Sequence, residues 1–254
     1  MYKRISLLLT ISNGVFSKTR LFNPEHIYTT SHINWSCFDE VILVCTDHKP
    51  DNKYYRFIEN IVEELGVPLS ISGDIKSLDD AEDLFNRGAD RIILNRAIWS
   101  KPNLIKDISE KYGKQAVIAS IDFGFHNNKY TSFDWVSKEY RDKLLPDYFK
   151  ELVDYIGEIL LQDVDQDGRV MGANIEAIQE ICSIFSKKIP IIIGSCGLVS
   201  WEQYCELLRL NYIDSVSVTN IHHMSVKSIN SLRRYSIIEK INVRNVLLPD
   251  MFDS

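Results

Sequence analysis

The sequence predicts an α/β fold, a TIM (β/α)8 barrel, and three features of the chain support this prediction. Eight short apolar runs, each typical of a buried strand, are spread over the 254 residues. Between most of them lie segments whose apolar residues recur at intervals of three and four, as in amphipathic helices. No Gly-x-Gly-x-x-Gly sequence follows the first run, which disfavours the main alternative, a dinucleotide-binding doubly wound sheet. Eight strands alternating with helices over about 250 residues are typical of the barrel.

The predicted strands and helices follow one another along the whole chain. The strands are the apolar runs at 4–11, 40–45, 68–72, 91–95, 116–122, 158–162, 190–194 and 215–219. Helices are predicted at 55–65, 77–88 and 174–188. Ser77 and Asp80 are spaced as a capping box at the start of the second helix, and Ser100 is expected to start a further helix.

Two segments of the chain share one plan, which indicates an internal repeat. Residues 67–98 and 189–221 each contain a Pro-led strand, a turn of small residues, a helix, an Asp and another strand. They lie about half a chain apart, as expected from duplication of a half-barrel. No Pro- or Gly-rich linker divides the chain, so we expect residues 1–254 to form a single barrel domain.

The composition is that of an ordinary globular protein, with 45% hydrophobic and 25% charged residues. The net charge of −6 gives no basic footprint for nucleic acid. No apolar run reaches the ~18 residues of a membrane span, and the N-terminal run predicts a first strand rather than a signal peptide. Five cysteines without a Cys-x-x-Cys pair predict reduced thiols, a cytoplasmic location and no zinc site.

The acidic stretch at 161–172 carries three alternating aspartates and a glycine, namely Asp163, Asp165, Asp167 and Gly168. An EF-hand calcium loop begins in this way, but its twelfth position needs a bidentate Glu, and here that position is Asn174. A helix should also precede such a loop, whereas residues 158–162 have the composition of a buried strand. We therefore expect no metal here, and the stretch predicts a carboxylate-rich loop at the end of a strand.

Six motifs follow one another along nearly the whole chain. They are NGVFSKT (13–19), RGADRIILNRAIWSKP (87–102), AVIASID (116–122), GEILLQDVDQDG (157–168), IPIIIG (189–194) and INVRNV (241–246). In order and spacing the chain resembles the cyclase (HisF) family of imidazole glycerol phosphate synthase, a lyase of histidine biosynthesis with a TIM barrel. The resemblance implies a glutaminase partner of the HisH type at the barrel bottom. Ammonia from that partner crosses the barrel to a small phosphorylated substrate at the top, and no cofactor is expected.

The resemblance also implies where the acid–base chemistry lies. In that family two aspartates act, one at the end of the first strand and one at the end of the fifth. Asp122 matches the fifth-strand position, and Thr10 occupies the first-strand position. A Thr hydroxyl has no accessible pKa near 7 and cannot serve as a general base in the same way. The candidate catalytic residues are therefore Asp122 and an altered partner, Thr10.

By the same resemblance, the substrate and its phosphates lie on the loops after strands three, four, six, seven and eight. The matching positions are Ser72, Gly73, Asn95, Arg96, Asp165, Asp167, Gly168, Gly194, Ser195, Thr219 and Asn220. Asp74 stands where a small residue would let phosphate approach backbone N–H groups, and its carboxylate is expected to repel phosphate. Arg96 offers an anion clamp instead. The alternative for residues 165–168 is a simple turn rich in Asp and Gly.

Charged residues begin four of the predicted strands, at Arg4, Glu40, Arg91 and Glu158. In the resembled family two basic and two acidic side chains at these positions form a salt-bridged gate where ammonia enters. A closed ring of alternating sign would plug the barrel mouth without leaving a buried charge unpaired. The alternative is that these are ordinary solvated charges at strand starts.

Other residues carry weaker signals. Cys196 is a candidate nucleophile by position alone, because no His is placed beside it by the sequence. His222 and His223 follow the last strand and are either substrate ligands or loop residues. Cys45 is expected to be a buried thiol on the second strand.

Two functions stay open at this point. The first is a cyclase-type lyase that uses ammonia from a partner glutaminase. The second is a non-catalytic or altered paralogue of the glycosyl amidation-associated (WbuZ) type. Such a paralogue would pass ammonia to a sugar amidotransferase in surface-polysaccharide (acetamidino sugar) biosynthesis. Thr10 and Asp74 favour the second function, whereas Asp122 and the motif at 165–168 favour the first.

Overall fold

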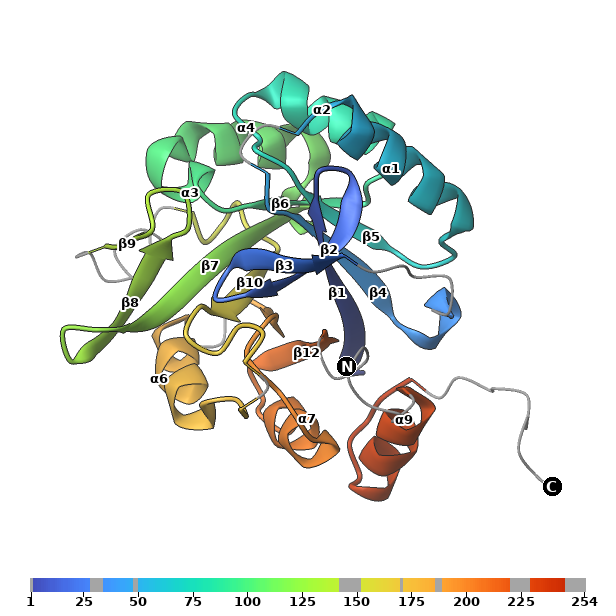
Figure 1. The fold of residues 1–254 in the computed structure, drawn as a ribbon, viewed down its shortest axis with the longest axis vertical. Helices are drawn as coiled ribbons and strands as arrows, with labels where there is room; N and C mark the ends of the chain where they lie inside the picture. The colour runs from blue at the N-terminus through green and yellow to red at the C-terminus, as the bar shows by residue number, and fades with distance from the viewer. Residues whose placement is uncertain are drawn as a thin grey trace.

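A closed barrel of parallel strands forms the centre of the computed structural model (Figure 1). The structure describes residues 2–27, 34–47, 50–141, 152–169, 171–185, 189–219 and 229–244. Within these ranges the barrel strands are β1 (Arg4–Ser12), β4 (Glu40–Cys45), β5 (Leu69–Ser72), β6 (Arg91–Leu94), β7 (Val117–His126), β10 (Glu158–Asp163), β11 (Ile191–Ile193) and β12 (Ile213–Val218). β1 pairs in parallel with β4 and β12, and β10 with β7 and β11, so the sheet closes on itself. The predicted TIM barrel is confirmed.

Helices surround the barrel (Figure 1). Those described are α1 (Asn52–Glu64), α2 (Leu78–Asn86), α3 (Ala97–Ser100), α4 (Pro102–Tyr112), α6 (Ile175–Phe185), α7 (Trp201–Leu208) and α9 (Ile229–Ile238), with 3-10 turns η1 (Trp35–Cys37) and η2 (Lys114–Ala116). The predicted capping box is present, because Ser77 and Asp80 exchange hydrogen bonds at the start of α2. The predicted helix start at Ser100 is wrong. Ser100 ends the one-turn α3, its hydroxyl donates to the Arg96 carbonyl at 2.9 Å, and α4 starts at Pro102.

Two antiparallel hairpins, which the sequence did not reveal, extend the barrel at the carboxyl ends of its strands. β2 (Val15–Arg20) pairs with the end of β1 and with β3 (Asn23–Ile27). β8 (Lys129–Asp134) pairs with the last residues of β7 and with β9 (Glu139–Tyr140). Figure 1 shows both hairpins projecting from the barrel, and they add walls to the site described below.

Alternation along the strands divides the core into two parts. One face of each strand packs against the helices, and the other points into the barrel. The inward cluster consists of branched aliphatic side chains: Leu8, Ile42, Ile93, Ile118, Leu160 and Ile192. Because both faces are buried, the strands appear in the sequence as near-continuous apolar runs. The two repeated segments supply β5–β6 and β11–β12, the third and fourth and the seventh and eighth barrel strands.

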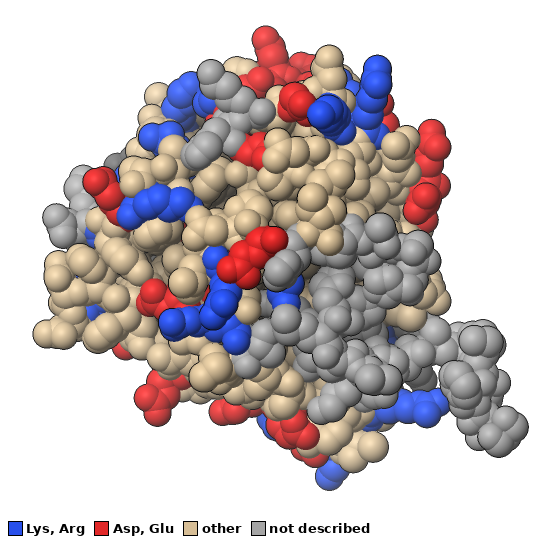
Figure 2. Space-filling view, in the orientation of Figure 1, with Lys and Arg blue, Asp and Glu red and all other residues tan. Residues whose placement is uncertain are grey.

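None of the described helices is both long and apolar enough to cross a membrane. The five cysteines are all free and buried. On the face seen in Figure 2, Lys and Arg side chains lie interspersed with Asp and Glu rather than in one basic field.

Candidate active site

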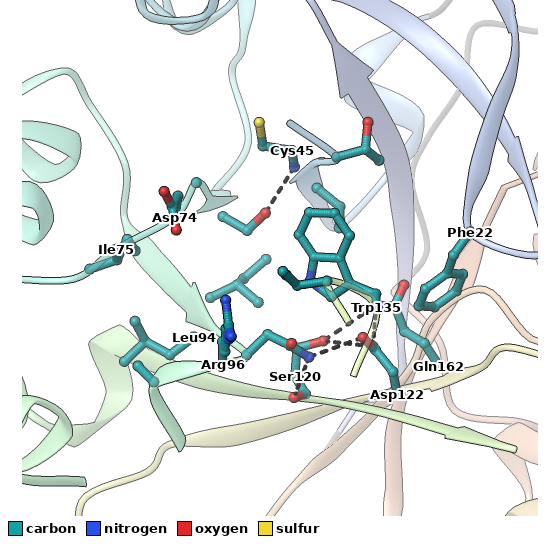
Figure 3. A pocket seen from close by; sticks show the side chains of 18 of the residues that line it. Phe22, Cys45, Asp74, Ile75, Leu94, Arg96, Ser120, Asp122, Trp135 and Gln162 are labelled. Atoms are coloured by element: carbon teal, nitrogen blue, oxygen red, sulfur yellow. Dashed lines mark hydrogen bonds between the residues drawn. The ribbon is translucent and has the colours of Figure 1, made fainter. Parts of the chain in front are cut away.

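A cavity of about 270 Å³ lies at the carboxyl ends of the barrel strands (Figure 3). Its polar lining comes from strand ends and the loops that follow them. Eight predicted site residues line it: Thr10, Ser72, Gly73, Asn95, Arg96, Asp122, Asp167 and Ser195. Four others, Asp165, Gly168, Gly194 and Thr219, do not line it. Asn220, His222 and His223 lie outside the described residues.

Asp122, on β7, is the buried carboxyl of the cavity, with an exposed fraction of 2%. Gln162 Nε2 donates to its Oδ1 at 3.1 Å, and Asn95 Nδ2 donates to its Oδ2 at 3.1 Å. Burial raises the pKa of Asp122 to about 7, although the hydrogen bonds from Gln162, Asn95 and Ser120 act in the opposite direction. This group can therefore both give and take a proton near neutral pH.

Gln162 was missed by the sequence analysis, although a signal was available. Side chains alternate along a strand, so Glu158, Leu160 and Gln162 of β10 share the inward face. Placing Glu158 at the barrel bottom would have put Gln162 at the top, beside the end of β7. The amide of Gln162 is thus a first neighbour of Asp122.

Thr10 lies at the end of β1, where the resemblance expects a carboxyl. Its hydroxyl lines the cavity and donates to the carbonyl oxygen of Ser17 in the neighbouring β2. The hydroxyl is thereby engaged in joining β1 to the β2–β3 hairpin.

Three cationic side chains line the cavity: Lys76 after β5, Arg96 after β6 and Lys101 between α3 and α4. Arg96 was predicted, whereas Lys76 and Lys101 were not. Lys101 Nζ donates to the Lys76 carbonyl at 2.8 Å, so the two loops are tied together. The side chain of Arg96 is 56% exposed, and its Nε reaches Asp134 only at 4.0 Å. This edge of the cavity is suited to an anionic group.

The loop after β5 differs from a phosphate loop built on backbone N–H groups. The N–H groups of Lys76 and Ser77 both donate to Asp80 Oδ2, at 2.9 and 2.8 Å. A carboxylate of the chain itself therefore occupies the donors that an anion would use. Asp74 does not stand unpaired here, because it forms an ion pair with Lys76.

The three aspartates of the acidic stretch contact three different parts of the molecule. Asp163 accepts the N–H groups of Asp165 and Gln166, at 2.9 and 3.2 Å, and so caps the turn. Asp165 accepts from Phe125 N at 2.7 Å and from Tyr140 Oη at 3.0 Å. These bonds tie the turn to the antiparallel strands formed by the end of β7, β8 and β9, called the β7–β9 extension. These two carboxyls serve structure, and neither lines the cavity.

Asp167 lines the cavity and anchors the β2–β3 hairpin. It accepts from Thr19 Oγ1 at 3.2 Å, from Phe22 N at 2.9 Å and from the Ser195 hydroxyl. Gly168 follows in the left-handed region at φ +68°, and a Cβ there would lie 2.2 Å from the Thr19 carbonyl oxygen. The glycine thus lets the turn pack against β2.

The thiols of Cys196, the candidate nucleophile, and of Cys45 are poor nucleophiles. Burial raises the pKa of Cys196 well above its ordinary value, and burial raises that of Cys45 to about 12. Cys45 nevertheless lines the cavity, and its backbone N–H donates to Ser72 Oγ at 2.8 Å. The expectation of a buried thiol at Cys45 is met.

At the amino-terminal end of the strands, the four charged residues of the predicted gate meet in a closed ring. Arg4 contacts Glu40 at 3.1 Å and Glu158 at 2.6 Å, and Arg91 contacts Glu158 at 2.5 Å and also Glu40. Each acid touches both arginines. Burial would raise the pKa of Glu40, but the charges of Arg91 and Arg4 outweigh it and hold that pKa below its usual value.

Comparisons with known proteins identify the family of the chain. A family model described as "Histidine biosynthesis protein" matches residues 9–226. Three similar relatives carry the name imidazole glycerol phosphate synthase subunit HisF. The one from Buchnera aphidicola is 29% identical, over 95% of this chain and 98% of the relative. Those from Pyrobaculum aerophilum (27%, over 81% of each chain) and Vibrio parahaemolyticus (28%, over 74% and 75%) are similar over shorter spans.

Proposed function

Because the chain belongs to the histidine biosynthesis protein family, we propose that it is the cyclase-type subunit of an ammonia-using synthase like imidazole glycerol phosphate synthase. It takes ammonia from a partner glutaminase and uses it on a phosphorylated substrate in the cavity. The observation that carries the proposal is Asp122, a buried carboxyl with a pKa of about 7 in a cavity at the carboxyl ends of the strands.

Asp122 is the general acid–base group in this proposal. Gln162 and Asn95 each donate to one of its oxygens, which fixes the orientation of the carboxyl toward the cavity. A pKa near the working pH makes a carboxyl effective in both directions of proton transfer. Thr10 supplies no carboxyl at the end of the first strand. Asp122 is therefore the only carboxyl at the two positions where the family carries its aspartates.

The phosphate of the substrate is bound by side chains rather than by backbone N–H groups. Arg96 and Lys101 supply the net positive charge, because the charge of Lys76 is compensated by its ion pair with Asp74. The backbone donors of the loop after β5 are already taken by Asp80. Guanidinium and ammonium groups bind phosphate through charge-assisted hydrogen bonds.

Ammonia enters through the charged ring at the other end of the barrel. The six aliphatic side chains that fill the barrel, Leu8 among them, lie between Arg4 at the ring and Thr10 at the cavity. An apolar layer favours uncharged ammonia over ammonium, because an unpaired ion is costly to desolvate. The ring must part for each passage, and a glutaminase bound at that end would supply the trigger. The free cysteines suit a reducing cytoplasm.

A second candidate is the altered paralogue that passes ammonia to a sugar amidotransferase. The favouring observation is the state of Thr10, whose hydroxyl is engaged by the Ser17 carbonyl at the position of the expected carboxyl. In this case the ring would retain its role while the cavity has lost or changed its reaction.

Turnover of the phosphorylated ribonucleotide substrate of imidazole glycerol phosphate synthase, with free ammonium, tests the first proposal. We expect turnover that is lost in Asp122→Asn and kept in Lys111→Met, a surface control from the pair of Lys111 with Glu82. Absence of turnover, together with stimulation of glutaminase activity on mixing, would favour the paralogue.

The same assay, supplied with glutaminase and glutamine in place of ammonium, tests whether the charged ring controls the entry of ammonia. Arg4→Ala should lower glutamine-dependent turnover while leaving ammonium-dependent turnover unchanged. If both activities survive equally, the ring does not control ammonia entry.

A further inference from the structure

The turn at residues 135–138, between β8 and β9, reaches across the cavity. The indole of Trp135 lines the cavity, and Figure 3 shows it among the strand-end side chains. On one side Lys138 Nζ donates to the Phe22 carbonyl at 3.4 Å and to Asn23 Oδ1 at 3.3 Å. These contacts tie the turn to the β2–β3 hairpin, whose Phe22 also lines the cavity.

On its other side the turn is held by Asp134, a residue that is 6% exposed. Asp134 Oδ1 accepts the N–H groups of Val136 at 3.0 Å and Ser137 at 3.4 Å, which fixes the turn. Its Oδ2 accepts from Arg141 and lies 4.0 Å from Arg96 Nε. One carboxylate therefore fixes the turn that carries the indole and lies beside the side chain expected to bind an anion.

We propose that the indole of Trp135 is a platform on which a planar ring of the phosphorylated ligand stacks, while Arg96 binds the phosphate. The inference rests on the proposed function, because it assumes that the cavity accepts a phosphorylated substrate. An indole offers a large, rigid π-face, and stacking of a base on an aromatic side chain contributes about 1–3 kcal/mol. The ligand class is a monophosphate with a planar ring, as in a nucleotide.

Asp134 is a positioning residue in this arrangement, since it acts through Trp135 and Arg96. Because its carboxylate fixes the turn and lies 4.0 Å from Arg96 Nε, it holds the indole platform beside the anion site. The cavity would thereby select ligands whose ring and phosphate are separated by the matching length. A ligand that has the phosphate but no planar aromatic ring would lose only the stacking contribution.

Calorimetric binding of two probes, AMP and ribose 5-phosphate, to the full chain tests the platform. We expect AMP to bind more tightly than ribose 5-phosphate. Trp135→Ala should weaken AMP binding by roughly 5- to 160-fold and ribose 5-phosphate binding by less than about twofold. Trp135→Phe should keep most of the preference. Phe125→Ala, an exposed aromatic on the same β7–β9 extension, is the control and should leave both affinities unchanged.

A second variant separates stacking from anion binding. Asp134→Asn keeps an oxygen for the N–H groups of Val136 and Ser137 but removes the charge beside Arg96. It should change both affinities by a similar factor, so the ratio between the probes is kept. Equal affinity of the two probes in the unmodified chain, or equal losses in Trp135→Ala, would overturn the platform.

These outcomes are independent of the proposed reaction. If AMP is preferred through Trp135 but ammonium-dependent turnover is absent, the reaction proposal fails and the platform stands. If turnover depends on Asp122 while Trp135→Ala leaves the substrate KM unchanged, the platform alone fails.

Discussion

The side-chain amide of Gln162 donates a hydrogen bond of 3.1 Å to Oδ1 of Asp122. The two side chains come from neighbouring strands, and the register pairs them directly. Burial raises the pKa of Asp122 to about 7, and the hydrogen bond from Gln162 limits that rise because it favours the charged form. A residue on another strand thus lowers the proton affinity that burial gives the candidate catalytic group.

Replacing Gln162 by Leu should raise the pKa of Asp122 further. The apolar side chain keeps the carboxyl buried but removes a donor that stabilises the carboxylate. Titration of the aspartate carboxyls by carbon-13 NMR measures the shift whether or not turnover occurs. Gln115→Leu, at an exposed position just before β7 begins, serves as the control. An unchanged midpoint in Gln162→Leu would show that burial alone sets this pKa.

Replacing Arg4 by Met should destabilise the barrel by about 3 kcal/mol. Glu40 is 1% exposed, and removing one partner of a buried ion pair leaves a charge incompletely compensated. Arg91 still contacts Glu40, so we expect the lower end of the usual range. Arg209→Met removes an exposed pair with Glu239 and should change the free energy of unfolding in urea by no more than about 0.5 kcal/mol.

The ring also predicts how stability depends on pH. The folded-state pKa of Glu40 is below its unfolded value of 4.5, so its contribution is present above that pH and is lost as the pH falls. In Arg4→Met the pKa of Glu40 should rise toward its unfolded value, so the stability lost on acidification below that value should be smaller. Urea unfolding between about pH 3 and pH 7 checks this, and an identical acid limb in both proteins would contradict it.

The sequence predicted the barrel well because its strands are buried on both faces. Residues 158–162, for example, form an apolar run bounded by charges, and this is a strong signal. The hairpins were missed because β2 and β8 are polar and pair only with strand ends, so their partners come from the fold. Trp135 and Phe22 reach the cavity from these hairpins, which is why neither was predicted.

Only some of the site residues could be predicted from the sequence, because the others are brought to the cavity by the fold. Asp122 follows from a motif at a strand end, where barrel sites lie. Lys76 and Lys101 sit on separate loops, and only the closed barrel places them together. Asp165 matched the motif, yet its carboxylate is used by Phe125 and Tyr140, because the β7–β9 extension folds over it.

Gly168→Ala should destabilise the fold by at least about 2 kcal/mol. The residue has φ +68°, and the added Cβ would lie 2.2 Å from the Thr19 carbonyl oxygen, so β2 would have to move. Gly66→Ala is the matched control, because nothing lies within 4 Å of its added Cβ. Thermal unfolding should show a large loss only in the first variant. Equal small effects would mean that the turn is free to shift.

Asp163→Asn should make the chain more stable at pH 8 and leave it nearly unchanged at pH 4. Burial, followed by the charge of Asp165, raises the pKa of Asp163 to about 7 in the folded protein. The folded state therefore holds a proton that the unfolded state releases, and stability falls as the pH rises from about 4 to about 7. An amide cannot ionise, so the variant avoids this loss and should gain at least about 1 kcal/mol at pH 8.

The amide oxygen of that variant can still accept from the N–H groups of Asp165 and Gln166, which Asp163 caps. Asp163→Ala removes this acceptor and should be about 1 kcal/mol less stable than Asp163→Asn at both pH values, as loss of a cap predicts. Chemical unfolding of the three proteins at pH 4 and pH 8 separates the charge from the cap. If Asp163→Asn and Asp163→Ala are equally stable, the cap contributes nothing. If Asp163→Asn gains no stability over the unmodified chain at pH 8, the buried charge carries no penalty.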